Sequence, residues 1–218
     1  MPSRCRRGST FAAIRLRSRN LLCYRKKIRP RGDARMNGTA TIGAAAPPLD
    51  AFEVFPFRAR PQASWHDSPR RFGARRANGR LHAGCDLYVP HGTEILAAAD
   101  GVITRFAFFA LNSTLTQKVS AMEILHAGGW IGRYCEIANT LPAGLKAGSA
   151  VKAGQVIAFV GPLMDVLDVP SDMLHFEMYA GTASGSLSDF GRPPFMRRKD
   201  LIDPTPYLDA AAARLGTT

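Results

Sequence analysis

Histidines and acidic residues supply the clearest chemical signal in the sequence. Two of the five histidines stand four or two positions before an acidic residue, in the pairs His82 and Asp86, and His175 and Glu177. On a β-strand, residues of equal parity lie on one face, so the members of each pair would point the same way, and Met173 would share the face of His175. Imidazole and carboxylate groups on one face are typical metal ligands and proton carriers.

The spacing of His82 and Asp86 sets a geometric condition on a metal site. On a straight strand these residues would be about 13 Å apart, whereas zinc–ligand bonds are about 2.0–2.2 Å long. The chain must therefore bend between them, and Gly84 is the residue that permits a bend. Two histidines, one carboxylate and an open water position form a catalytic zinc site. The alternative is a structural hydrogen bond between His82 and Asp86, with His175 as an ordinary strand residue.

Short β-type runs separated by glycine and proline would position these side chains. Turn signals such as Pro90-His91-Gly92, Gly128-Gly129 and Ala153-Gly154 separate the runs. Many short strands at this spacing predict an all-β sandwich or barrel. A single helix is expected from Pro204 to Leu215, with Gly216 as its stop. We expect strands near 81–88, 94–98, 101–110, 118–126, 130–138, 151–160 and 172–180.

The positive charge of the chain is concentrated at one end. The 218 residues include 29 basic and 17 acidic residues, a net charge of +12. Residues 1–35 hold twelve of the basic residues and one acid, which leaves residues 36–218 with 17 basic and 16 acidic residues. We therefore predict three segments: a basic arm (1–35), an irregular approach segment (36–79) and a β domain (80–215). The arm is disordered, or translation begins at Met36, or the arm contacts anionic lipid or nucleic acid.

Several classes of protein are disfavoured. The longest apolar run, Phe106 to Leu111, has six residues, whereas a membrane span needs about 20. No signal peptide is visible, because no apolar stretch of about 7–15 residues follows the N-terminal charge. The four cysteines show no C-x-x-C pairing, which argues against a zinc ribbon or a disulfide scaffold. The spacing does not tell whether Cys85 and Cys135 meet.

Residues 80–180 resemble a known family in the order and spacing of several motifs. The resemblance is to the lysostaphin-type (LytM-like) zinc endopeptidases, which cut peptides of bacterial peptidoglycan. The motifs that carry it are His82-x-Gly84-x-Asp86, Pro90-x-Gly92-Thr93-x-Ile95-x-Ala97, Val151-x-x-Gly154-Gln155-Val156-Ile157 and Leu174-His175-Phe176-Glu177, with Asp203-Pro204 near the end.

The resemblance implies a fold, a cofactor and a substrate. The fold would be an all-β hybrid sandwich-barrel, a duplicated hybrid motif, with a groove. One zinc ion would be held by His82, Asp86 and His175, and the substrate would be a peptidoglycan peptide. The implied location is the cell envelope or periplasm. No nucleic-acid partner is expected for the domain, and the oligomeric state stays open.

Two assisting histidines of the family are replaced in this sequence. Met173 stands at the first histidine of H-x-H, and Glu136 stands at the histidine of Y-x-H-L. In one interpretation Glu136, expected to share a face with Tyr134, is the general base, and Tyr134 or Asp172 assists. In the other, the site is degenerate and the domain binds peptidoglycan or a partner without cutting it.

Two rival classes have weaker support. A biotinyl- or lipoyl-type carrier shares the glycine-bounded hairpin texture of residues 151–161, but the chain has no Met-Lys-Met turn for the cofactor. A nucleic-acid-binding protein is suggested only by residues 1–35. His126 is expected to be a hairpin residue and not a ligand, and His91 is expected to be solvated in its turn.

Overall fold

The computed structural model describes residues 45–108, 119–163 and 172–216. The basic arm, the ends of two expected strands (109, 110 and 118) and most of the segment before Met173 lie outside the described residues. The described helical elements are the 3-10 helices η1 (Leu49–Ala51) and η2 (Ala77–Gly79) and the α-helix α2 (Thr205–Ala212). The strands are β1 (Cys85–Tyr88), β2 (Glu94–Leu96), β3 (Gly101–Phe108), β4 (Val119–His126), β5 (Trp130–Ala138), β6 (Ala150–Val151), β7 (Val156–Phe159), β8 (Met173–Tyr179) and β9 (Leu201–Ile202).

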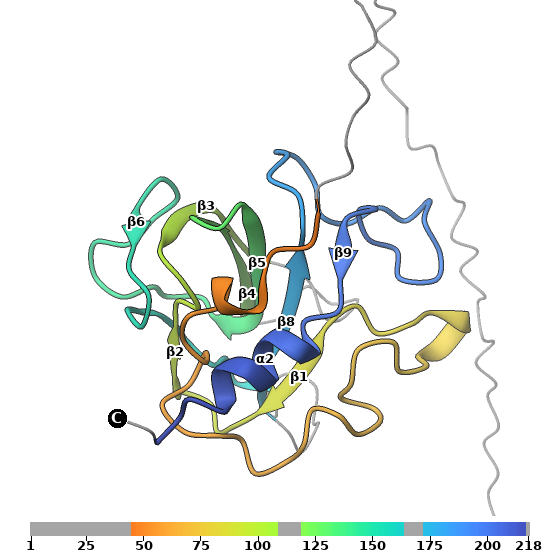
Figure 1. The fold of residues 1–218 in the computed structure, drawn as a ribbon, viewed down its shortest axis with the longest axis horizontal. Coiled ribbons are helices and arrows are strands. Elements are labelled where there is room, and N and C mark those ends of the chain that lie inside the picture. The colour runs from red at the N-terminus through yellow and green to blue at the C-terminus, as the bar shows by residue number, and fades with distance from the viewer. Residues whose placement is uncertain (1–44, 109–118, 164–171, 217–218) are drawn as a thin grey trace, which may run out of the picture. The chain divides into compact units, whose positions relative to one another are not determined.

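The described strands form two antiparallel sheets. The larger sheet has seven strands in the order β1-β8-β5-β4-β3-β6, with β9 paired to β8, and the smaller sheet pairs β2 with β7 (Figure 1). The predicted all-β class with one C-terminal helix is therefore confirmed. Among the described residues, the pairing order of the large sheet does not close on itself. No helix in this described part is long and apolar enough to cross a membrane.

Three elements differ from the sequence prediction. The first strand begins at Cys85 and not at residue 81, because the chain bends at Gly84. The expected strand 151–160 is two strands, β6 and β7, which belong to different sheets because the turn at Ala153-Gly154 separates them. The two-residue strand β9 was not predicted, since so short a run has no period to detect.

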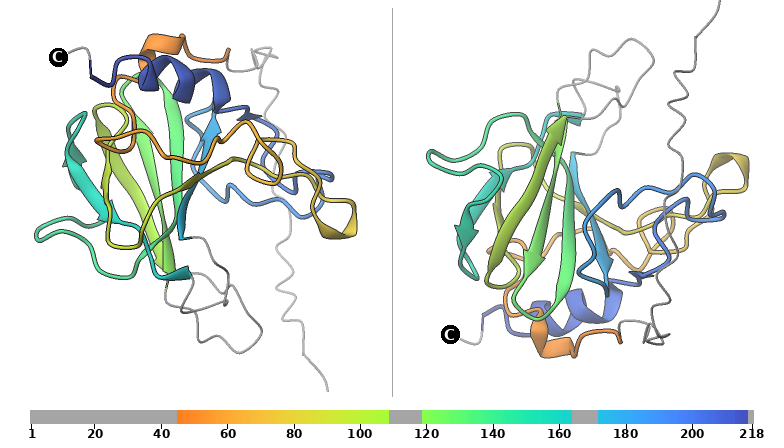
Figure 2. Two further views of the ribbon diagram at one scale, coloured as in Figure 1. Left: turned by 90° about the horizontal axis from the view of Figure 1, so that it is seen from below. Right: turned by 90° about the horizontal axis from the view of Figure 1, so that it is seen from above.

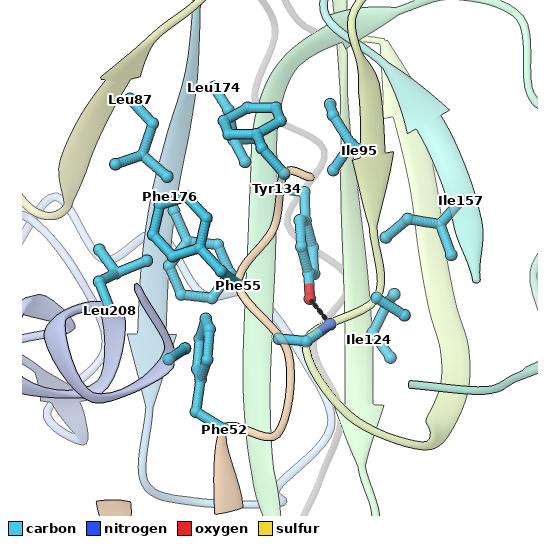
Figure 3. Close-up of a cluster of buried hydrophobic side chains, with 14 of the residues drawn as sticks. Phe52, Phe55, Leu87, Ile95, Ile124, Tyr134, Ile157, Leu174, Phe176 and Leu208 are labelled. Carbon is cyan, nitrogen blue, oxygen red and sulfur yellow. Dashed lines mark hydrogen bonds between the residues drawn. The ribbon is translucent and has the colours of Figure 1, made fainter. Parts of the chain in front are cut away.

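One hydrophobic core lies between the two sheets. Alternate residues of the large sheet, such as Tyr134, Phe176 and Ile124, point to the same side as Ile95 and Ile157 of the small sheet (Figure 3). The side chains of all five are fully buried. The opposite face of the large sheet carries polar side chains such as Glu123, Arg133 and Glu177 beside a second, small hydrophobic cluster of Ile131, Tyr179 and Leu187. This division fixes which residues of β5 and β8 can reach a surface site.

The irregular residues before β1 also contribute to this core. Phe52, Phe55 and Trp65 are at most 1% exposed, and each such side chain contributes roughly 1.5–3 kcal/mol by burial. The indole N–H of Trp65 donates to Asp209 of α2 at 3.1 Å. Figure 2 shows η1 beside α2 at one end of the large sheet, in agreement with their contacts. Phe52, Phe55, Trp65 and α2 therefore shield one end of the core from solvent.

Gly84 is required because its backbone lies against β8. A Cβ at this position would collide with the carbonyl oxygen of Phe176 and lie 3.0 Å from Cε1 of His175. The bend at Gly84 brings His82 back toward Asp86, as the spacing argument demands. Asp86 is itself paired with His175 in the β1–β8 register. Backbone geometry therefore brings the three predicted ligands together.

We expect Gly84→Ala to lower the free energy of unfolding by about 1–3 kcal/mol, because the added methyl group forces β1 and β8 apart. It should also weaken metal binding, because His82 and His175 lie on either side of the displaced contact. Gly92→Ala is the control: its φ of +77° makes alanine strained, but nothing lies within 4 Å. Denaturant unfolding and Zn²⁺ titration measure the two effects. Wild-type metal affinity in Gly84→Ala would contradict this role.

Candidate metal centre

His82, Asp86 and His175 converge on one point. Nε2 of His82 is 2.9 Å from Nδ1 of His175 and 2.9 Å from Oδ1 of Asp86. Nδ1 of His175 is 2.8 Å from the same Asp86 oxygen. His82 and Asp86 are each 5% exposed, and His175 is nearly as enclosed. Among the described residues, these three form the group of side chains whose ligand atoms could hold one metal ion.

The outer atom of each side chain is already hydrogen-bonded to the protein. Nδ1 of His82 donates to the carbonyl oxygen of Arg71 at 2.9 Å. Nε2 of His175 donates to Oε1 of Glu177 at 3.0 Å. Because each neutral imidazole has one N–H, both rings present a lone pair to the centre. Oδ2 of Asp86 accepts from Arg76 at 2.9 Å, and Oδ1 also faces inward.

Three lone-pair atoms that face one another need a positive charge between them, which either a proton on Nδ1 of His175 or a metal ion can supply. Left unmet, each buried acceptor would cost about 1–3 kcal/mol. The donor set of two imidazoles and one carboxylate is the set that zinc binds in hydrolytic sites, with a further position open. The residues present therefore fit a metal ion of this kind. Their outward hydrogen bonds fix the tautomers in the way that metal-binding histidines need.

The pKa values show the same demand for positive charge. Burial disfavours the charged form of His175, but hydrogen bonds to Asp86 and Glu177 outweigh burial and raise its pKa to about 10. Burial and the neighbouring His175 lower the pKa of His82. Burial alone would raise the pKa of Asp86, yet its hydrogen bonds to the two histidines hold that pKa well below the usual range. A cation held by all three satisfies each of these groups.

Glu177 anchors His175, because it accepts a hydrogen bond from the ring nitrogen that faces away from the converging atoms. Its carboxylate is fully buried and accepts from His175, from Arg197 at 2.8 Å, from Arg133 at 3.2 Å and from the hydroxyl of Tyr179 at 2.5 Å. Burial would raise the pKa of Glu177, but these partners hold it well below the usual range. Two arginines thus keep the anchor ionised, and the anchor fixes the ring orientation of His175.

The converging atoms open into a cavity of about 650 Å³. Its floor is the polar face of β5 and β8, and its walls come from η2 with the following turn and from residues 188–197. The side chains that matter for its chemistry are His82, Asp86, Arg133, Cys135, Glu136, Met173, His175 and Glu177, with Arg76, Arg80, Phe190 and Arg197 on the walls.

Glu136 reaches this cavity through an irregular backbone. Its φ is +59°, and its carbonyl oxygen accepts the N–H of Gly161 at 2.8 Å. Oε2 is buried and has no hydrogen-bond partner among the described residues. Burial raises the pKa of Glu136 to about 7, aided by the nearby charges of Asp86 and Glu177 and opposed by His175. A carboxylate in this state can accept a proton near neutral pH.

Tyr134 does not lie at this cavity. It points to the core face of β5, is fully buried, and its hydroxyl accepts the N–H of Ala98 at 3.0 Å (Figure 3). The hydroxyl donates to Nε2 of His126, whose Nδ1 donates to the carbonyl of Ala99. The prediction that Tyr134 and Glu136 share a face is wrong, because the backbone irregularity at Glu136 breaks the alternation. The geometry gives no support to a catalytic Tyr134.

The other predicted residues lie around the site or away from it. Met173 lines the cavity. Asp172 lies 3.6 Å from exposed His91 and is not among the residues that line it. His126 is buried at the end of β4 and stacks on Trp130, outside the converging group.

Cys85 and Cys135 are both free thiols, so they do not form a disulfide with each other.

Sequence reasoning missed the residues that orient the ligands. Arg76, Arg133 and Arg197 come from three separate segments, and their partners Asp86 and Glu177 are known only from the fold. Glu177 itself was placed on the correct face by parity, but parity does not say what it binds. The one available signal was an acid two residues from a ligand histidine on the same strand face.

Residues 80–186 match the sequence profile of peptidase family M23. This segment contains all three converging residues and the motifs from His82 to Glu177 that resemble lysostaphin-type peptidases, and the segment belongs to that family.

Two curated relatives are similar to part of this chain. One is the peptidoglycan DD-endopeptidase ShyC of Vibrio cholerae, 31% identical over 94 residues, which are 43% of this chain and 20% of ShyC. The other is the cell division protein DipM of Caulobacter vibrioides, 32% identical over 112 residues, which are 51% of this chain and 16% of DipM. The matched segment therefore spans a fifth or less of either relative.

Solved structures are also similar. The catalytic domain of the antimicrobial peptidase lysostaphin from Staphylococcus simulans is 20% identical, with a TM-score of 0.45 over 64% of this chain and 89% of that domain. The structure of LytU is 23% identical, with a TM-score of 0.48 over 70% of this chain and 97% of LytU.

We expect Tyr134→Phe to lower the free energy of unfolding by about 1–3 kcal/mol, because the buried N–H of Ala98 loses its acceptor. Zn²⁺ affinity should stay unchanged, since the hydroxyl is on the other face of β5. Denaturant unfolding and metal titration of the same preparation test both statements. A variant with full stability and weakened metal binding would place Tyr134 in the site after all.

We expect Glu177→Gln to weaken Zn²⁺ binding about 10- to 100-fold, because the anchored orientation of His175 is lost. Tyr179→Phe is the matched control: it removes another hydrogen bond to the same carboxylate without touching His175. Its effect on metal affinity should be smaller. Competition titration with a chelator gives the affinities, and circular dichroism verifies that both variants are folded. Equal affinities for wild type and Glu177→Gln would refute the anchor.

Proposed function

We propose that the chain is a zinc-dependent endopeptidase that cleaves peptide bonds of bacterial peptidoglycan. His82, Asp86 and His175 would hold one zinc ion, and Glu136 would be the general base. The observation that carries the proposal is that the three converging ligand atoms share one cavity with a carboxylate oxygen of Glu136 that has no hydrogen-bond partner among the described residues. The family match supports a peptidase, and the relative named as a peptidoglycan endopeptidase supports the substrate.

The protein's own residues would move one proton. A bound zinc ion would acidify water and polarise the scissile carbonyl. Glu136 takes a proton from the water whose oxygen attacks the peptide carbon. It then gives this proton to the amine nitrogen as the C–N bond breaks, which leaves an amine and a carboxylic acid that releases its own proton to solvent. A pKa of about 7 suits both steps, because the group can accept and return a proton at neutral pH.

The location follows from the substrate. Peptidoglycan lies outside the cytoplasmic membrane, so we propose that the protein acts in the cell envelope or periplasm. The relatives ShyC and DipM carry names that refer to peptidoglycan and to cell division, which supports the same location.

A degenerate binding domain is the second candidate function. It is favoured by one specific observation, the replacement of two assisting histidines of the family by Glu136 and Met173. In this case Glu136 would be a polar residue of a ligand-binding cavity and not a base. The domain would then bind peptidoglycan or a partner without cutting it.

The test is hydrolysis of purified cross-linked peptidoglycan by the zinc-loaded full chain, measured as newly released amino groups. Glu136→Gln should lower the rate at least about 100-fold, because general-base catalysis contributes that much or more, while zinc content stays the same. His175→Ala should lose both zinc and activity. Glu94→Gln, an exposed carboxylate of β2 paired with Arg58, is the control and should keep the wild-type rate.

One outcome would contradict the enzymatic function, and another would contradict only the role of Glu136. Stoichiometric zinc with no hydrolysis, together with retention on insoluble peptidoglycan, would leave the binding function. Equal rates for wild type and Glu136→Gln would show that hydrolysis occurs without the proposed base.

A further inference from the structure

The cavity wall carries an excess of positive charge. Four arginines line it, against the carboxylates of Asp86, Glu136 and Glu177. Arg133 and Arg197 are paired with Glu177, and Arg76 is paired with Asp86 at 2.9 Å. A divalent ion at the converging atoms would add two more positive charges. The cavity therefore favours an anionic group on whatever enters it.

Arg80 is the one arginine of the wall with no ion-pair partner among the described residues. Its side chain is exposed, and it follows η2, where the backbone N–H of Arg80 donates to Ala77. The N–H of Arg76 donates to the carbonyl oxygen of Arg80 at 2.8 Å, so one tight turn holds both arginines. The next residue, Leu81, donates its N–H to Pro194 at 3.0 Å and ties this turn to the opposite wall.

The lining of the cavity also includes an exposed apolar side chain. Phe190 lines the same cavity and is 79% exposed. Arg80 is therefore the charged residue among the exposed side chains that line the cavity. The converging ligands and Glu136 are more deeply buried. A guanidinium held on a turn presents a planar set of donors, which matches a carboxylate in two-point geometry.

We propose that Arg80 binds a free carboxylate of the substrate, so that the site selects peptides with an acidic group close to the scissile bond. The proposal rests on the proposed function, because it concerns the substrate of the same cavity. It names the substrate class as a carboxylate-bearing peptide and not a neutral bridge such as polyglycine. Arg80 is a specificity residue in this account, and it takes no part in the proton transfer.

The experiment compares two probes with the zinc-loaded full chain. Muropeptide dimers released from purified peptidoglycan are used with their peptide carboxylates free, or after conversion of these carboxylates to carboxamides. The readout is the ratio of kcat/KM for the two probes, or the ratio of their Kd values by calorimetry where no turnover occurs. The wild type should prefer the free carboxylates about three- to tenfold, as expected for one charge-assisted contact at a partly exposed site.

Substitution of Arg80 tests whether this residue causes the preference for free carboxylates. In Arg80→Gln the ratio should fall to about one, and in Arg80→Lys it should be intermediate, because a lysine keeps the charge but loses the two-point geometry. Arg58→Gln is the matched control, since it removes the same charge from a different cavity and should keep the wild-type ratio. Rising salt should lower the wild-type preference.

The outcomes separate this inference from the proposed function. A preference that persists in Arg80→Gln would show that the carboxylate binds the metal ion or another group, and it would overturn the inference. Equal kcat/KM or Kd values for both probes in the wild type would also overturn the inference, even if hydrolysis occurs. Selective binding that depends on Arg80, without any hydrolysis, would support the inference and contradict only the proposed endopeptidase activity.

Discussion

The geometry of the candidate metal centre depends on the hydrogen bonds that His82 and His175 make to the surrounding protein. Each ring donates its one N–H to the protein, to the carbonyl of Arg71 and to Glu177. The opposite nitrogen of each ring must then present a lone pair to the centre, where Asp86 adds a carboxylate oxygen at 2.8–2.9 Å. This cluster needs a positive charge at its centre: a proton on His175 supplies it when no metal is bound, and a metal ion would satisfy all three atoms together. The cavity, the buried carboxylate of Glu177 and the side chain of Glu136 lie around these three residues.

The fold meets the requirement with backbone geometry. β1 and β8 pair Asp86 with His175, and the bend at Gly84 returns His82 to the same point. Tight contact between Gly84 and β8 leaves no room for a side chain. The core beneath, closed at one end by η1 and α2, keeps the two strands in register. The ligand atoms are therefore positioned by rigid elements, as a precise metal site needs.

Local patterns predicted the fold class, because alternating strands and glycine or proline turns are short-range features. Strand parity and Gly84 allowed His82 and Asp86 to share a site, but the inclusion of His175 with them came from the family resemblance. Parity failed at Tyr134 and Glu136, because a single positive φ at Glu136 turns this side chain toward the cavity. The anchors Arg133 and Arg197 could not be predicted, since their contacts with Glu177 join distant segments.

The most direct test of the central claim is the stoichiometry of Zn²⁺ binding by the purified full chain. The account predicts one ion per chain, with affinity lowered at least about 100-fold when any one of His82, Asp86 or His175 is replaced by alanine. Failure of the wild-type chain to bind Zn²⁺, or equal binding by all three variants, would contradict it.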